Sequence, residues 1–145
     1  MGIDPTLFNR IGGLEGLRKV HKTFYDKMFA HPWLKQFFVD HPQEIFENQQ
    51  TNFMAGLMGG PKIYAGKTPK MAHQNILITD DMFEMRSKIL SQSIKDAGIA
   101  DEIREEWLDA DRTLKRAIVK SSTSECRTMF EGQRIFDIPK PGTIA

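Results

Sequence analysis

Apolar residues recur along the chain at steps of three and four, the spacing that gathers side chains on one face of an α-helix. The longest stretches with this spacing predict helices over about 13–29, 42–58, 80–97 and 100–120. A short helix is expected to begin at His31-Pro32 and end by Phe38, because proline fixes the backbone of a first helical turn. No stretch alternates apolar and polar residues as a strand does. The pattern therefore predicts an all-α fold.

Glycine and proline mark the connections between these helices. Gly59-Gly60-Pro61 is a strong helix breaker and ends the helix over 42–58. The stretch from Pro61 to Lys70 is typical of a loop, and a helical turn or two is expected around 69–75. Thr79 then supplies a capping oxygen for the next helix, whose first turn is acidic. The helices are therefore joined by short turns within a single domain.

The sequence after residue 120 differs from the helical stretches before it. It begins with a Ser/Thr cluster and carries two prolines near its end. We therefore divide the chain into a domain over 1–120 and a C-terminal extension over 121–145. Four apolar residues of the extension are expected to dock on the helical domain: Met129, Phe130, Ile135 and Phe136.

Composition is typical of an ordinary globular protein. The chain has 145 residues, with 20 Lys plus Arg against 19 Asp plus Glu and a formal net charge of +1. This balance gives no field for holding a nucleic acid or an anionic membrane, so neither is expected as a partner. No apolar run approaches the roughly 18 residues that cross a bilayer. Cys126 is the only cysteine, which excludes an intrachain disulfide and favours a reducing, cytoplasmic location.

Polar side chains on an apolar helix face are the first sign of a functional site. In the helix over 42–58, at least one of Gln49 and Gln50 must share a face with phenylalanine and methionine residues. A buried amide without a partner costs about 1–3 kcal/mol, and Tyr25 raises the same question beside another apolar stripe. If these donors converge, they describe a small-molecule cavity. Otherwise the glutamines flank the stripe at the surface and Tyr25 reaches water.

The four histidines differ in their sequence surroundings. His31 and His41 each precede a proline and are typical of exposed helix starts, whereas His21 lies on a core stripe. His73 lies in a short apolar segment. A single imidazole there is either a core residue or the axial ligand of a haem iron, whose other four nitrogens come from the porphyrin. Zinc is not expected, because no second histidine and no cysteine pair lie near His73.

A set of short motifs occurs in a fixed order along the chain. They are Ile11-Gly12-Gly13-Leu14-Glu15, Phe24-Tyr25, Phe37-Phe38, Leu57-Met58-Gly59-Gly60-Pro61, Tyr64-Ala65-Gly66, Met71-Ala72-His73 and Ile78-Thr79. Each motif is weak alone, but together they resemble the truncated haemoglobins, and the pairing of tyrosine with glutamine is most like group I. The resemblance extends from Leu7 to Lys120. It implies a two-over-two helical globin around haem b, iron protoporphyrin IX.

The resemblance also implies roles for individual residues. The family's proximal iron ligand matches His73, and its distal tyrosine matches Tyr25. The distal helix positions that face the iron match Phe46 and Gln50, with Gln49 beside them. The expected partner of the tyrosine and glutamine donors is then dioxygen bound to the haem.

Four further positions concern the walls of such a pocket. Phe38 matches an aromatic residue wedged against the porphyrin, and Phe53 matches a phenylalanine of the pocket or its access route. Lys70 lies one helical turn before the matched histidine, as a cationic neighbour of the haem propionates or as a solvated lysine. Arg86 departs from the family, in which this position is apolar or tryptophan. We therefore expect Arg86 to turn toward the rim or to leave its place to Met85.

The resemblance implies reversible binding of dioxygen, with nitric oxide and carbon monoxide as further ligands. Oxidation of nitric oxide is an alternative activity that needs a separate reductase, because the chain carries no flavin or nicotinamide motif. Gas sensing is a second alternative, with the extension over 121–145 as its candidate output element. A helical interaction module without a cofactor is the alternative from another class of function.

Overall fold

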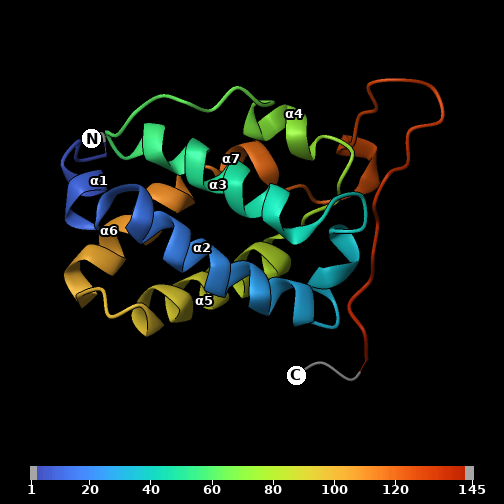
Figure 1. Cartoon of the computed structure of the whole chain (residues 1–145). Helices are drawn as coiled ribbons and strands as arrows, with labels where there is room; N and C mark the ends of the chain where they lie inside the picture. Colours follow the sequence, from blue (N-terminus) through green and yellow to red (C-terminus); the bar gives the residue numbers. More distant parts are fainter. Residues whose placement is uncertain (1–2, 143–145) are drawn as a thin grey trace.

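The computed structural model describes residues 3–142, and helices are its regular elements (Figure 1). In chain order they are α1 (Leu7–Arg10), α2 (Gly13–Ala30), the 3-10 helix η1 (Leu34–Phe37), α3 (Gln43–Leu57), α4 (Pro69–His73), α5 (Asp80–Asp96), α6 (Asp101–Arg112), α7 (Lys115–Ile118) and the 3-10 helix η2 (Thr123–Glu125). Within residues 3–142 no strand forms, and extended pairing is limited to two isolated bridges, Ile76 with Phe136 and Ile78 with Val119. The all-α prediction is confirmed.

Two pairs of helices form the body of the molecule. α2 packs against α3 on one side and against α5 on the other, and α5 packs against α6. The pair of α2 and α3 thus lies over the pair of α5 and α6, in the predicted two-over-two arrangement (Figure 1). The side chains between these helices are almost wholly shielded from water: Leu17, Val20, Phe24, Met54, Met58, Leu90, Ile94 and Trp107. Burial of large apolar side chains contributes about 1.5–3 kcal/mol each, so this layer stabilises the whole fold.

The long helices begin where the sequence supplies starting signals. Gly12 precedes α2 with a left-handed φ of 95°, and Thr79 caps α5 by accepting the Met82 N–H at 3.4 Å. The predicted bounds of α2, α3 and α5 agree with the structure to within one residue at each end.

One predicted helix is wrong in its length. The chain over 100–120 forms α6 and α7 with a break between them rather than one continuous helix. The Thr113 hydroxyl donates to the Ala110 carbonyl at 2.6 Å, and the N–H groups of Thr113 and Leu114 bond to carbonyls three residues back. Side-chain bonding of this kind competes with the helical ladder. The resulting turn brings Ile118 of α7 into a buried position.

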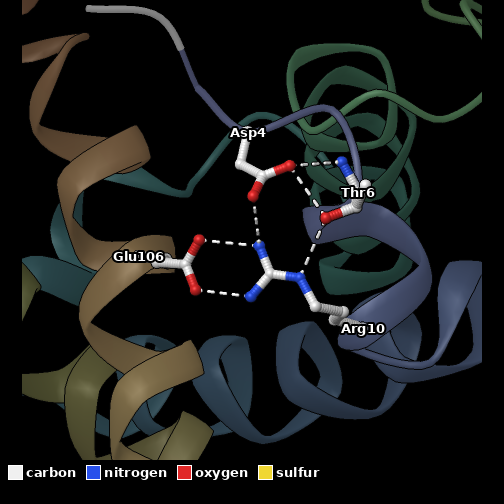
Figure 2. A network of polar contacts seen from close by, with 4 residues as sticks. All are labelled: Asp4, Thr6, Arg10 and Glu106. Atoms are coloured by element: carbon white, nitrogen blue, oxygen red, sulfur yellow. Dashed lines mark hydrogen bonds and ion pairs between the residues drawn. The ribbon is translucent and has the colours of Figure 1, made fainter.

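The N-terminal turn α1, which periodicity does not predict, is fastened to the body at two places. Gly59 takes a left-handed φ of 95°, and a Cβ at this position would overlap the Pro5 carbonyl. On the other side, the Arg10 guanidinium donates to the Glu106 carboxylate of α6 and to Asp4 (Figure 2). These ion pairs are exposed, so they fix the position of α1 more than they stabilise the fold.

The C-terminal extension runs back along the segment between α4 and α5. The Leu77 N–H donates to the Phe136 carbonyl, and the Phe136 N–H donates to the Asn75 carbonyl, both at 2.8 Å. Phe136 and Ile138 are buried against Trp33, whose indole N–H donates to the Ile138 carbonyl at 2.8 Å. The extension is therefore an integral part of the packed structure.

Of the four residues predicted to dock, Phe136 alone is buried. The prediction is wrong for Met129, Phe130 and Ile135, which are 48%, 64% and 40% exposed. Their exposure follows from the backbone path, because the extension is paired to the body at residue 136 and not along the loop before it. Within residues 3–142 no helix combines the length and apolarity needed to cross a membrane.

Candidate functional site

A cavity of about 600 Å³ lies between the layer of α2 and α3 and the segments around α4, α5 and α7. This volume falls within the range of about 300–1,000 Å³ that is common for small-molecule and cofactor sites. The apolar part of the lining includes Phe24, Met28, Leu34, Phe37, Phe38, Phe46, Phe53, Ile76, Ile78, Met82, Phe83, Leu114, Ile118 and Phe136. The polar part includes Tyr25, Gln49, Gln50, Lys67, His73 and Arg86. Such a lining suits a large apolar ligand oriented by a few polar groups.

We name the two sides of this cavity by their elements. The proximal wall consists of α4 and the following residues 74–78, and the distal wall consists of α2, η1 and α3. α4 packs against α7, whereas α2 packs against η1 and α3. His73 therefore belongs to one wall, and Tyr25 and Gln50 belong to the other.

His73 is the last residue of α4 and is held in a defined orientation. The Thr68 hydroxyl caps this helix by accepting the Met71 N–H at 3.2 Å, and Pro69 occupies its first turn. His73 Nδ1 lies 2.7 Å from the Pro69 carbonyl and donates to it. Burial lowers the pKa of His73, so the imidazole is neutral at pH 7. The Nε2 lone pair is then available to a metal, and the bonded Nδ1 fixes the tautomer.

Lys120, which is distant from α4 in sequence, holds the C-terminal end of this helix. Its Nζ donates to the carbonyls of His73, Ile76 and Ile118 at 2.8, 2.9 and 3.2 Å. The carbonyls of His73 and Ile76 also accept the N–H groups of Ile76 and Ile78, so the ammonium group adds a second, charged donor that links the end of α4 to α7. Sequence reasoning missed Lys120, because a lysine at a helix end is usually solvated and nothing local indicates three acceptors.

Tyr25 is buried in the distal wall within a cluster of aromatic rings. Its ring lies 5.9 Å from that of Phe38 and 6.2 Å from that of Phe46, and these two rings are 5.0 Å apart. Burial raises the pKa of Tyr25 to about 12, so its hydroxyl keeps its proton at pH 7. Within residues 3–142 no hydrogen bond engages this hydroxyl, which lies at the cavity. The hydroxyl is therefore a donor that is open to the cavity and that no other residue of the described chain uses.

The two glutamines occupy different depths. Gln50 is half-buried and Gln49 is exposed, and both border the cavity. Phe53, one helical turn further along α3, packs edge-on against Tyr64 with ring centroids 5.3 Å apart. The geometry therefore favours Gln50 over Gln49 as a donor to a ligand deep in the cavity, while Phe53 and Tyr64 lie together at its lining.

The other three histidines lie in three different environments. His21 is buried, lies 2.7 Å from the Thr51 hydroxyl, and has its pKa lowered to about 3 by burial. His31 Nδ1 accepts the N–H groups of Trp33 and Leu34 at the start of η1. His41 is exposed at the cavity, 6.0 Å from the Phe46 ring.

The structure also gives the positions of Lys70 and Arg86, for which the sequence allowed two alternatives each. Lys70 is exposed and lies outside the cavity lining, whereas Lys67 belongs to it. Arg86 stays in the cavity wall, and Met85 does not replace it there. The Arg86 guanidinium makes two hydrogen bonds, of 2.7 and 3.1 Å, to the Asp111 carboxylate of α6. Asp111 is the partner that sequence reasoning missed, because the two residues lie on different helices.

These residues fit a haem. One neutral imidazole presents Nε2 to a cavity with aromatic walls, and a tyrosine hydroxyl without a protein partner lies at the same cavity. Within residues 3–142 no three His, Cys, Asp or Glu side chains gather as metal ligands. A single axial histidine is sufficient for haem iron, because the porphyrin supplies the remaining equatorial ligands.

Known proteins resemble this chain over most of its length. The bacterial-like globin family matches residues 6–120. The chain is 30% identical over 99 residues to a group 1 truncated haemoglobin of Tetrahymena thermophila, covering 68% of this chain and 82% of that protein. It is 32% identical over 105 residues to one of Mycolicibacterium paratuberculosis, covering 72% and 77%. The truncated haemoglobin of Tetrahymena pyriformis in its Fe(III) form is similar in structure, with a TM-score of 0.72, 25% identity, and 79% and 98% of the two chains covered.

Proposed function

Since the chain belongs to the bacterial-like globins, among the group 1 truncated haemoglobins, we propose that it binds haem b and holds dioxygen reversibly. Family membership implies a haem cofactor and the binding of diatomic gases. The observation that carries the proposal is His73, with Nδ1 bonded to Pro69 and Nε2 available, in an aromatic cavity that also holds Tyr25 and Gln50.

His73 would hold the iron through Nε2. The haem would supply an iron that binds diatomic gases and transfers partial negative charge to them. The bond from Nδ1 to the Pro69 carbonyl keeps the imidazole in the tautomer that leaves Nε2 unprotonated. Phe38, Phe46 and Phe53 would pack against the macrocycle and exclude water. Two exposed lysines would be cationic neighbours of the haem propionates: Lys67, which lines the cavity, and Lys70 of α4, which does not.

Tyr25 and Gln50 would donate hydrogen bonds to the bound gas. The raised pKa of Tyr25 keeps its hydroxyl a donor at every physiological pH. A hydrogen bond to a charge-bearing acceptor contributes about 1.5–3 kcal/mol, or roughly ten- to a hundredfold in affinity. Dioxygen acquires more charge than carbon monoxide, so these donors favour dioxygen. Gln49, which is exposed, would act at the rim.

Reconstitution with haemin tests the proposal directly. Purified protein should take up one haem per chain, show a Soret band, and bind and release dioxygen repeatedly after reduction. Absence of a Soret band after haemin addition would support the cofactor-free interaction module instead. Nitric oxide supplied together with oxygen and an electron donor tests the detoxification alternative, because sustained nitrate formation would make oxidation of nitric oxide the primary activity.

A further inference from the structure

The ion pair between Arg86 and Asp111 is oriented with respect to the cavity. The Arg86 side chain is 21% exposed and belongs to the cavity lining, whereas the Asp111 side chain is 2% exposed and lies outside it. The cation of the pair therefore belongs to the cavity wall, and the carboxylate lies away from the cavity. An oriented pair of this kind gives a positive potential on the cavity side even though the pair has no net charge.

Arg86 still has donors to offer. A guanidinium carries five N–H groups, and Asp111 accepts from NH1 and NH2, one bond each. The Arg86 guanidinium carbon lies 5.3 Å from the Phe24 ring centroid and 5.6 Å from that of Phe83. These cation–π contacts and the two bonds to Asp111 fix the position of the group. Within residues 3–142 no hydrogen bond engages its three remaining N–H groups, and the side chain that carries them lines the cavity.

The charge of Arg86 also acts on the functional groups of both walls. It lowers the pKa of His73 in addition to the effect of burial, and it opposes the rise that burial causes in the pKa of Tyr25. The other ionisable side chains that border the cavity are Asp40, His41, Tyr64 and Lys67. Asp40, His41 and Lys67 are all exposed, so Arg86 is the shielded cation among the residues that line the cavity.

We propose that Arg86 forms a subsite for small polyatomic monoanions, of the size of azide or nitrite, in the part of the cavity beside Phe24 and Phe83. The inference rests on the proposed haem function, since one end of the anion would bind to ferric iron while the other end accepts from Arg86. Tyr25 can donate to the same anion. The proposal predicts that this chain prefers anions over neutral diatomic ligands more strongly than a variant with an apolar residue at position 86.

Three variants test the subsite. Arg86→Met/Asp111→Leu removes the pair without leaving a buried carboxylate unpaired, which alone could unfold the protein. Asp111→Asn keeps the cation and removes its counter-charge. Arg112→Met is the matched control, because Arg112 is exposed and pairs with Asp109 at 3.2 Å, away from the cavity. The ferric proteins are titrated with sodium azide and sodium nitrite, and the ferrous proteins with carbon monoxide, by the Soret shift.

We expect the double variant to bind azide and nitrite about tenfold or more weakly, the loss of a charge-assisted hydrogen bond, with carbon monoxide affinity within about twofold. Asp111→Asn should bind both anions more tightly and raise the midpoint potential of the haem, whereas Arg112→Met should change neither. Equal azide affinity in the double variant and the wild type would overturn the subsite, as would an equal loss for carbon monoxide. A wild type that takes up no haem would overturn the proposed function together with this inference. The Soret band of the wild type therefore distinguishes the two failures.

Discussion

The two walls of the cavity are built in different ways. The distal wall comes from long helices, α2 and α3, which pack along their apolar faces and bury side chains such as Leu17 and Met54 completely. The proximal wall comes from the five-residue helix α4 and the residues that follow it. Hydrogen bonds from Lys120, Arg127 and the backbone of Phe136 hold this second wall.

The two walls therefore hold their functional side chains in place by different interactions. The geometry of the distal wall comes from regular helix packing. Many side-chain contacts contribute to it, so the loss of a single contact is tolerated. The proximal wall depends on a few polar contacts, such as the Arg127 N–H to the Gln74 carbonyl at 2.7 Å. Loss of one buried partner there leaves an unsatisfied group. We therefore expect the proximal wall to govern retention of the cofactor and the distal wall to govern ligand release.

Replacement of His73 by glycine is expected to have the largest effect. Without the imidazole the proposed bond to the iron is lost, and the variant should retain no haem through gel filtration. Imidazole added to the buffer should restore a Soret band by entering the space left by the side chain. His41→Ala is the control, since this histidine is exposed at the cavity. A normal haem spectrum in His73→Gly without imidazole would exclude His73 as the ligand.

Replacement of Tyr25 by phenylalanine should affect release rather than retention. The dissociation rate of dioxygen is expected to rise by about ten- to a hundredfold, because one donor to a charge-bearing acceptor is lost. Stopped-flow mixing measures this rate, and haem retention should stay normal. Tyr64→Phe is the matched control, because the Tyr64 hydroxyl donates to the Lys67 carbonyl and not to a ligand. An unchanged dissociation rate in Tyr25→Phe would contradict the proposed hydrogen bond.

Replacement of Lys120 by methionine should affect haem retention rather than the release of dioxygen. The carbonyls of His73, Ile76 and Ile118 lose a shared donor. We expect haem to transfer to an excess of apomyoglobin about fivefold faster, corresponding to ~1 kcal/mol, with little change in dioxygen release. Lys88→Met, at an exposed position of α5, controls for the loss of a lysine. Equal transfer rates in the two variants would show that the proximal wall does not need this contact.

A change of pH should have the smallest effect. Tyr25 donates only while protonated, and burial raises its pKa to about 12, so it loses its proton about two units above the usual tyrosine value. The dissociation rate of dioxygen should therefore stay constant from neutral pH to about pH 10 and rise only near pH 12. A marked increase below pH 10 would indicate that Tyr25 is far more solvated than the distal wall implies.

The distal wall could largely be predicted from the sequence, for a physical reason. Helical periodicity is a local property, so the bounds of α2 and α3 followed from residues within those helices. The resemblance to truncated haemoglobins predicted that Tyr25, Gln50 and His73 form one site, and all three do line one cavity. Their individual roles stay predictions that the variants above test.

The long-range contacts could not be predicted from the sequence. Phe130 and Phe136 both follow polar stretches, yet only Phe136 is buried, because its backbone pairs with Asn75. The sequence indicated no partner for a charged side chain at position 86, whereas the structure shows that Arg86 pairs with Asp111. The break between α6 and α7 depends on the Thr113 hydroxyl, whose competition with the helical ladder is not visible in a pattern of apolar residues.

The pairing of Phe136 with the segment after His73 also bears on the order of folding. Contacts between residues far apart in the chain form late, because a long loop must close before they are rewarded. We therefore expect α2 and α3, which are neighbours in sequence, to assemble before residues 136–138 dock beside Trp33 and complete the proximal side. In this order of assembly, the proposed haem would enter from the proximal side before residues 136–138 dock.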